Sequence, residues 1–214
     1  MSKKILAAIV LASLCVVSVA GATPMTEFKK GDLQIDVGGW QHGGKFDKIG
    51  ATGENLSGDS KIGFVGTATY AIADKWGVQY SYHDLTTGNL DNGYDNYHVG
   101  GYQNELNVLY SFDPKAAAYV GWDYLHGNVA SQTRKNNVVQ VGIVAKTPLT
   151  NKLDLYGNFA LGTKSTFLGE AGLGYNLAKN LDLNFGYRYL KTEYSSNEYS
   201  IKGFFMGVSG RFGK

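Results

Sequence analysis

Hydrophobic and polar residues alternate along most of the chain. In one block the odd positions are apolar or aromatic and the even positions are polar or glycine: Leu181, Asp182, Leu183, Asn184, Phe185, Gly186, Tyr187, Arg188 and Tyr189. A period of two predicts a β-strand with two chemically different faces. Tyr and Trp lie near the ends of the apolar face, and the opposite face is polar and rich in glycine. This combination predicts a barrel whose apolar face is directed outward, into lipid.

Blocks of this kind recur about ten times along the chain. We therefore predict an all-β fold, an antiparallel up-and-down transmembrane β-barrel of ten strands. Eight strands is the alternative, if the glycine-broken first block or the short connection at 163–166 is misread. The predicted strands are 32–46, 59–72, 76–86, 102–113, 116–127, 136–148, 152–162, 167–177, 180–191 and 199–212.

The connections between these strands alternate in length. Tight turns are predicted at 73–75, 113–115, 149–151 and 178–180. Longer stretches rich in Gly, Asn, Asp and Ser occur at 47–58, 87–101, 128–135 and 192–198. Bacterial barrels have short turns on the periplasmic side, long loops outside and an even number of strands. The alternation therefore also predicts which end of the barrel is periplasmic.

The first residues predict an export signal. Lys3 and Lys4 precede an apolar stretch from Ile5 to Ala20, and small residues up to Ala22 form a cleavage site. This is the organisation of a secretory signal peptide, a helix removed after export through the Sec pathway. A membrane anchor is disfavoured because the apolar stretch is shorter than the ~20 residues that a spanning helix needs.

Three segments follow: a signal peptide over 1–22, a short periplasmic segment over 23–31 and the transmembrane barrel over 32–214. Loss of the first segment removes two of the 20 basic side chains, so that 18 remain against 18 acidic ones. It also removes the only cysteine, Cys15. The neutral balance and the lack of a basic stripe argue against nucleic acid as a partner.

The inward faces of the predicted strands carry the polar residues. We expect a polar network in the lumen that includes Glu170, Arg188, Asp182, Asn176 and Asp123. Ten strands leave at most a narrow, largely occluded bore. Because acidic residues outnumber basic ones among the inward candidates, a thin water path there would favour cations mildly.

Aromatic residues near the strand ends are expected to form a girdle at the level of the lipid headgroups, where amphipathic rings are favoured. The predicted members are Trp76, Phe112, Trp122, Tyr124, Tyr187 and Tyr189. Between the two headgroup levels, apolar side chains of the same parity are expected to contact lipid.

The register of one hairpin follows from its turn. A turn at 178–180 places Glu170 opposite Arg188 and Asn176 opposite Asp182. Directly opposed side chains on one face interact, so we expect an ion pair in the lumen.

The same reasoning applies to the preceding hairpin. With Leu161 opposite Gly169, Tyr156 lies across from Gly174. An aromatic ring that covers a bare glycine backbone helps to fix strand register.

The last segment repeats the alternation at Phe204, Met206, Val208, Gly210 and Phe212. With the export signal, the ten strands and the short–long connections, the chain resembles the OmpA/OmpX-type superfamily of small, porin-like bacterial outer-membrane barrels over essentially its whole length. The resemblance implies a location in the outer membrane, contact with outer-membrane lipid and insertion by the barrel-assembly machinery. It does not indicate a solute or an extracellular ligand.

Candidate catalytic residues are isolated in the sequence. The histidines His42, His83, His98 and His126 show none of the spacings of a metal site. His83 and Asp84 are adjacent in one strand and point to opposite faces, so they do not form a dyad. Ser131, near His126, is explained by turn chemistry, and the oxygen-rich stretch 91–96 lacks the last acidic ligand of a calcium loop. We predict no catalytic, cofactor-binding or metal site.

The sequence therefore predicts a non-enzymatic outer-membrane barrel that serves as an envelope structural protein, a narrow porin or a surface-loop binding platform. The alternative is an enzyme active at the rim, either an omptin-like protease or a lipid-modifying barrel. A third hypothesis, a soluble β-sandwich or a lipocalin-like secreted binder, requires the apolar faces to point inward.

Overall fold

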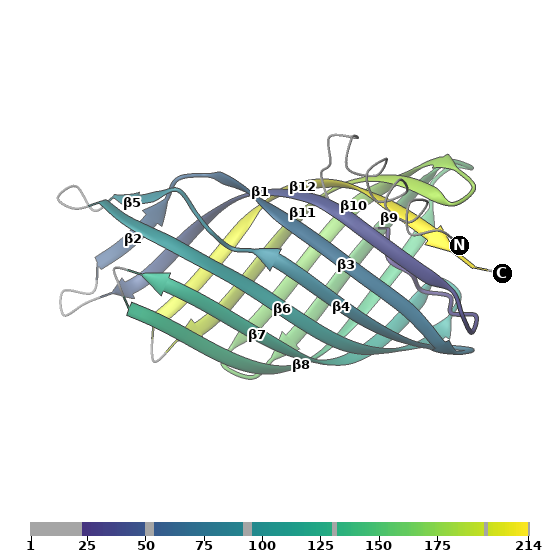
Figure 1. Ribbon diagram of the computed structural model, residues 1–214, viewed down its shortest axis with the longest axis horizontal. Helices are drawn as coiled ribbons and strands as arrows, with labels where there is room; N and C mark the ends of the chain where they lie inside the picture. Colours follow the sequence, from purple (N-terminus) through teal and green to yellow (C-terminus); the bar gives the residue numbers. More distant parts are fainter. Residues whose placement is uncertain (1–22, 50–53, 92–95, 130–131, 195–196, 214) are drawn as a thin grey trace, which may run out of the picture.

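Ten long strands form one closed antiparallel barrel in a computed structural model of the chain, which describes residues 23–49, 54–91, 96–129, 132–194 and 197–213. Each long strand pairs with the next, and the last pairs back with the first (Figure 1). The predicted ten-stranded barrel is confirmed. No helix among the described residues is long and apolar enough to cross a membrane. The strands are β1 Leu33–Ile49, β3 Lys61–Ala73, β4 Trp76–Asp84, β6 Asn96–Asp113, β7 Ala116–Val129, β8 Gln132–Pro148, β9 Leu153–Gly162, β10 Thr166–Ala178, β11 Leu181–Tyr194 and β12 Asn197–Phe212.

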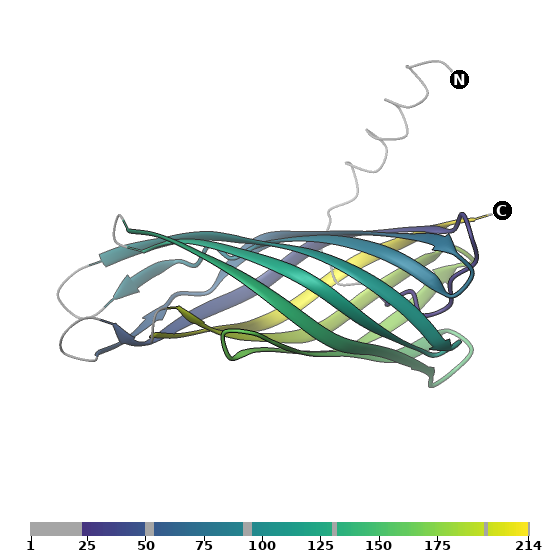
Figure 2. The same cartoon turned by 90° about the horizontal axis from the view of Figure 1, so that it is seen from below.

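The two ends of the barrel differ. At one end β1 begins, β12 ends and the connections after β3, β6, β8 and β10 are short; we call it the turn end. At the opposite end, the loop end, two short strands, β2 (Glu54–Gly58) and β5 (Asn89–Asp91), pair with each other. They also extend the ladders of β1 and β6. Both views show this extension beyond the main cylinder (Figures 1 and 2).

Several strands are longer at the loop end than the sequence predicted. The stretches 128–135 and 192–198 were expected to be loops, but β7 and β8 are joined across 130–131 and β11 and β12 across 195–196. Their polar ends stay paired through side chains: Thr133 Oγ1 donates to Asn128 Oδ1 at 2.8 Å, and Lys191 Nζ lies 2.6 Å from Glu198 Oε2. The prediction failed because it relied on hydrophobic alternation, which stops where strands leave the lipid.

The large apolar side chains of the strands point outward. On β7, Val120 is 52% exposed and Trp122 is 45% exposed, whereas Asp123 and Leu125 are fully buried. The same division holds on β12, where Phe204 and Met206 point outward and Phe205 is buried, in the phase that the sequence predicted. This apolar outer surface is the inside-out arrangement that the alternation predicted.

The lumen is less polar than the sequence predicted. Large apolar side chains are buried inside it at several levels: Trp40, Leu109, Leu125, Val138, Leu168, Leu190, Ile201 and Phe205. A barrel of ten strands is narrow enough for inward side chains to fill. Apolar residues on the inward parity therefore pack against each other, and alternation alone does not reveal them.

Both predicted hairpins have inward-facing partners, but only one register is right. Glu170 pairs with Arg188, as predicted. Tyr156 lies opposite Gly172, not Gly174, and a Cβ at Gly172 would lie 2.6 Å from the Tyr156 ring. The aromatic–glycine contact therefore exists two residues away from its predicted place.

The turn between β9 and β10 causes this two-residue difference in the pairing register of the two strands. Lys164 and Ser165 have positive φ angles of 58° and 48°, and Thr166 N donates to Thr163 O at 3.2 Å. Positive φ at both central residues is the feature of a type I′ turn, whose backbone matches strand twist. The ladder closes at the pair Gly162–Thr166, so only residues 163–165 connect the two strands, a tighter closure than the sequence suggested.

The segment 23–31, predicted to be a short periplasmic segment, precedes the first strand of the barrel. Its first part lies within the turn end of the barrel, where Thr23, Met25, Thr26 and Phe28 are buried, whereas Lys29 is exposed. The apolar side chains Met25 and Phe28 explain this placement, because burial in the lumen removes them from water.

Candidate functional site

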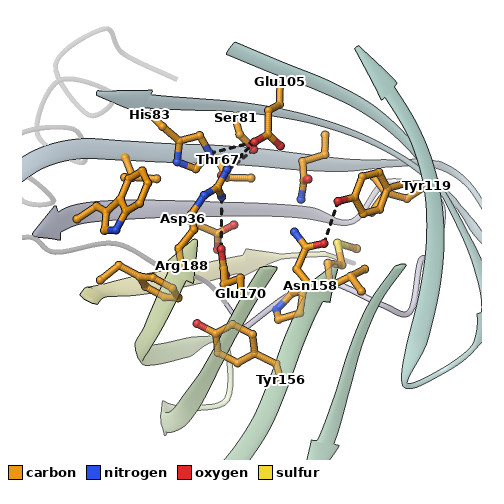
Figure 3. Close-up of a pocket in the computed structure, with 18 residues that line it drawn as sticks. Asp36, Thr67, Ser81, His83, Glu105, Tyr119, Tyr156, Asn158, Glu170 and Arg188 are labelled. Atoms are coloured by element: carbon orange, nitrogen blue, oxygen red, sulfur yellow. Dashed lines mark hydrogen bonds and ion pairs between the residues drawn. The ribbon is translucent and has the colours of Figure 1, made fainter. Parts of the chain in front are cut away.

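The centre of the lumen contains an arginine held by carboxylates from both walls. Arg188 Nη1 lies 3.3 Å from Glu170 Oε2 on the adjacent strand β10. Arg188 Nη2 lies 2.7 Å from Glu105 Oε1 on β6, and β6 is five strands from β11 in both directions around the barrel. Figure 3 shows the guanidinium between the two carboxylates. The side chain of Arg188 therefore bridges the lumen from one wall to the other.

Amide side chains extend this bridge along β6. Gln103 Nε2 donates to Glu105 Oε1 at 2.8 Å and to Asp123 Oδ2 at 2.9 Å, while its Oε1 accepts from Arg188 Nη2 at 3.3 Å. Asn107 Nδ2 donates to Glu105 Oε2 at 3.4 Å. The Trp40 ring lies 5.7 Å from Arg188 Cζ, a cation–π distance. The result is a connected polar layer across the barrel.

A small cavity adjoins this layer on the side of the turn end. Its volume is about 70 Å³, and its walls include Asp36, Glu170, Arg188, Tyr156 and His83 (Figure 3). The Tyr156 hydroxyl and both ring nitrogens of His83 have no hydrogen-bond partner among the described residues. Polar cavities of this size hold water molecules in proteins.

An apolar layer closes the lumen on the other side, toward the loop end. Leu168, Leu190 and Ile201 are neighbours in register on β10, β11 and β12. Leu125 on β7 and Leu85 after β4 are also buried in the same hydrophobic cluster. Large side chains thus occupy the bore above the polar layer.

A second polar group lies near the turn end. Arg211 Nη2 contacts Asp182 Oδ2 at 2.9 Å, and Arg211 Nε donates to Gln34 Oε1 at 3.1 Å. Asn184 Nδ2 donates to Ser209 Oγ at 2.7 Å. This group is distinct from the bridge around Arg188.

The five residues of the predicted lumen network thus divide between two levels. Glu170, Arg188 and Asp123 belong to the central layer, and Asp182 belongs to the group at the turn end. Asn176 is half-buried opposite Asp182. Sequence reasoning missed Glu105 as a partner of Arg188, because no local register relates strands on opposite walls.

A family model described as the outer membrane protein beta-barrel domain matches residues 9–212. The chain belongs to this family. It is therefore an outer-membrane barrel of the Gram-negative envelope, and the resemblance predicted from the sequence is confirmed. Its turn end is the periplasmic end and its loop end is the extracellular end. The predicted signal peptide, residues 1–22, lies outside the described residues.

Solved structures of outer-membrane barrels are similar to this chain. The outer membrane protease OmpT from Escherichia coli has a TM-score of 0.55 and 10% identity, over 85% of this chain and 96% of that one. OprG from Pseudomonas aeruginosa has a TM-score of 0.44 and 14% identity, over 89% and 100% of the two chains. Ail of Yersinia pestis has a TM-score of 0.42 and 14% identity, over 86% and 99%. At these identities the likeness concerns the fold alone. No match was found among curated proteins.

The predicted girdle residues all lie on the outer surface of the outer-membrane barrel. At the periplasmic end, Trp76 packs on Tyr110 with ring centroids 4.8 Å apart, and Phe112 is exposed nearby on the same strand as Tyr110. Farther toward the extracellular end, Trp122 lies 6.0 Å from Tyr124.

Two further girdle residues lie on β11, also toward the extracellular end. Tyr187 lies 5.1 Å from the ring of Phe204, and Tyr189 lies 5.8 Å from that of Phe167. The six rings therefore share the outer face of the barrel, and their place at the headgroup layers stays a prediction.

The histidines that were weighed as catalytic groups lie in unlike environments. His83 is buried in the lumen, with Nε2 3.7 Å from Glu105 Oε1, whereas Asp84 accepts from Thr86 N. His126 stacks on the outward-facing Tyr102 at 4.9 Å. Ser131 and most of the stretch 91–96 lie outside the described residues. Within the described part of the chain, no cluster of His, Cys, Asp and Glu has the arrangement of a metal site.

Proposed function

We propose that this outer-membrane barrel is a non-enzymatic envelope protein with a closed lumen, which acts as a structural element and as a platform for binding at its extracellular end. The observation that carries the proposal is the bridge of Arg188 to Glu105 and Glu170 from opposite walls, stacked on the apolar layer of the lumen. A solute that passes through would have to separate a buried ion pair and then part large apolar side chains. Both steps are costly, and they argue against a narrow porin.

The extracellular end supports the platform role. β1, at 17 residues, is about 56 Å long at ~3.3 Å per residue, whereas the apolar band of such barrels is ~25 Å tall. Even with a tilt of ~40°, the strand extends beyond the membrane. With β2 and β5, the extended strands form a ridge of paired backbone outside the lipid. A hydrogen-bonded ridge presents side chains in fixed positions.

A catalytic role has less support. His83, the histidine with an acidic neighbour, is enclosed in the lumen and is 4% exposed, so that an extracellular peptide or lipid does not reach it. As part of the proposal, the barrel-assembly machinery inserts the chain into outer-membrane lipid.

Single-channel recording tests the closed lumen. The purified chain, refolded and inserted into planar lipid bilayers, is expected to show no conductance above leak. The control for an opened lumen is a chain that lacks 23–28 and carries Leu168→Gly, Leu190→Gly and Arg188→Gly, which removes the amino-terminal segment and large side chains from both blocking layers. Reproducible current steps from the unaltered protein would overturn the proposal.

A further inference from the structure

The chain's own amino-terminal segment, Thr23–Phe28, lies inside the periplasmic half of the lumen. Thr23 and Thr26 are fully buried, and Met25 and Phe28 are nearly so. The barrel ladder begins only at Leu33. The segment is thus not part of the wall but is an occupant of the lumen.

The segment is held by contacts from four parts of the barrel. Thr23 N donates to Asn184 Oδ1 of β11 at 2.8 Å, and Thr23 O accepts from Gln34 Nε2 of β1 at 3.0 Å. Thr26 Oγ1 donates to the carbonyl of Pro114 in the turn after β6 at 2.7 Å.

The fourth contact comes from the turn after β3, where Lys75 N donates to Phe28 O at 3.1 Å. Contacts from two strands and two turns thus fix both ends of the segment inside the periplasmic end of the lumen.

Two glycines of the wall make room for the segment. At Gly77, the three nearest atoms to an added Cβ are all ring carbons of Phe28, the closest at 2.6 Å. At Gly174, an added Cβ would overlap the Thr23 hydroxyl. A larger side chain at either position would therefore conflict first with the segment; at Gly174 the Asn184 Oδ1 of the wall, 3.0 Å away, would also have to shift.

The segment lines the internal cavity on its periplasmic side. Pro24 and Met25 form part of the cavity lining, together with Asp36, Glu105, Glu170 and Arg188. The three carboxylates exceed the one guanidinium, and low-dielectric walls strengthen the field of such an excess. The unpartnered Tyr156 hydroxyl and His83 nitrogens leave hydrogen-bonding capacity for an occupant.

We propose that Thr23–Phe28 is a displaceable plug. When docked, it closes the periplasmic mouth of the lumen; when displaced, it opens a chamber, lined by Asp36, Glu105 and Glu170, that admits small cations from the periplasm. The predicted cleavage after Ala22 makes Thr23 a free chain end, so the plug can leave without breaking a strand pairing. Because the apolar layer stays in place, displacement opens a blind chamber and not a pore.

A cysteine reporter tests the plug. The sequence from Thr23 onward has no cysteine, and Ser81 is a buried residue of the cavity wall. We would compare Ser81→Cys in three refolded chains: one that begins at Thr23, one that lacks 23–28, and one that begins at Thr23 and carries Gly77→Val with Gly174→Val. The last variant displaces the plug without removing it and serves if the deletion does not fold.

The measurement is the rate of modification by a cationic and an anionic methanethiosulfonate of similar size. Deletion or displacement of the plug is expected to raise the rate by about tenfold or more, because the closed form otherwise limits access. The cationic reagent is expected to react about tenfold faster than the anionic one. Lys179→Cys, in an exposed turn at the same end, is the control and should react equally in all three chains.

Equal rates at Ser81→Cys with and without the plug would overturn the proposal, as would faster modification by the anion. These outcomes are independent of the conductance test, because a blind chamber carries no current. A barrel that conducts current would contradict the closed lumen. A barrel that carries no current, but in which Ser81→Cys reacts equally fast with and without the plug, would contradict only the plug.

Discussion

A single guanidinium group connects the two walls of the lumen. Arg188 contacts Glu170 beside it and Glu105 across the bore, and all three side chains are largely buried. Removing the partner of a buried ion costs more free energy than removing the partner of an exposed ion, because water does not solvate the ion that remains. The Glu170 contact was predictable from hairpin register, whereas the Glu105 contact depends on barrel closure.

Replacement of this arginine should therefore be costly. We expect Arg188→Leu to lower the free energy of unfolding by about 3–5 kcal/mol, because it leaves two buried carboxylates unpaired. Urea unfolding in detergent, followed by tryptophan fluorescence, measures the change. Adding Glu105→Gln and Glu170→Gln should recover much of the loss.

Arg211→Leu provides the matched control. Its contact with Asp182 is similar in length, but the Arg211 side chain is 37% exposed. We expect a smaller cost for this change, about 1–2 kcal/mol, because only one buried carboxylate, Asp182, loses its cationic partner and solvent reaches the Arg211 side of the contact. Equal costs for the two substitutions would contradict a special role of the central bridge.

Different features of the sequence determine where the strands end at the periplasmic side and at the extracellular side. At the periplasmic end, strands stop at short turns such as Pro114–Lys115, and the predicted boundaries are close to the observed ones. At the extracellular end, β7, β8, β11 and β12 continue beyond the last lipid-facing residues. Backbone hydrogen bonds and polar cross-strand contacts sustain them there, so the hydrophobic pattern does not mark where they end.

The turn between β9 and β10 offers an element-level prediction. Lys164 and Ser165 both have positive φ, which costs residues with a Cβ roughly 1 kcal/mol each. Asn followed by Gly is the favoured pair for this turn. We expect Lys164→Asn with Ser165→Gly to raise the free energy of unfolding by about 1 kcal/mol.

The urea midpoint of the same unfolding transition measures this effect. Lys179→Asn with Asn180→Gly, in the turn between β10 and β11, is the control, since neither residue has a positive φ. A gain from the control and none from the test pair would contradict the assignment of strain to Lys164 and Ser165.

The molecule as a whole has an apolar outer surface and a filled interior. Side chains such as Phe64, Val120 and Phe204 are more than half exposed on the outer face. Pairing of β12 with β1 leaves no free edge in the main barrel, as a protein that spans lipid requires. Stability in this architecture depends on the ring remaining closed.

Closure of the barrel predicts how the whole molecule migrates in gel electrophoresis before and after heating. In sodium dodecyl sulfate, the unheated barrel should migrate differently from the boiled chain, because a closed ladder resists the detergent until it is heated. The folded protein should also require detergent or lipid to remain dispersed. A natively folded, monodisperse chain in plain buffer would contradict an outward apolar face.

The sequence by itself determined the class of fold, the number of strands, the face that meets lipid and the pairing of Glu170 with Arg188. These are local properties, because side-chain parity and short turns act over neighbouring residues. Tertiary structure decided what fills the lumen: Glu105 reaching Arg188 from the opposite wall, the apolar layer around Leu190, and Thr23–Phe28 inside the periplasmic mouth. Such contacts join segments far apart in the chain, and they exist only once the ring has closed and fixed the width of its bore.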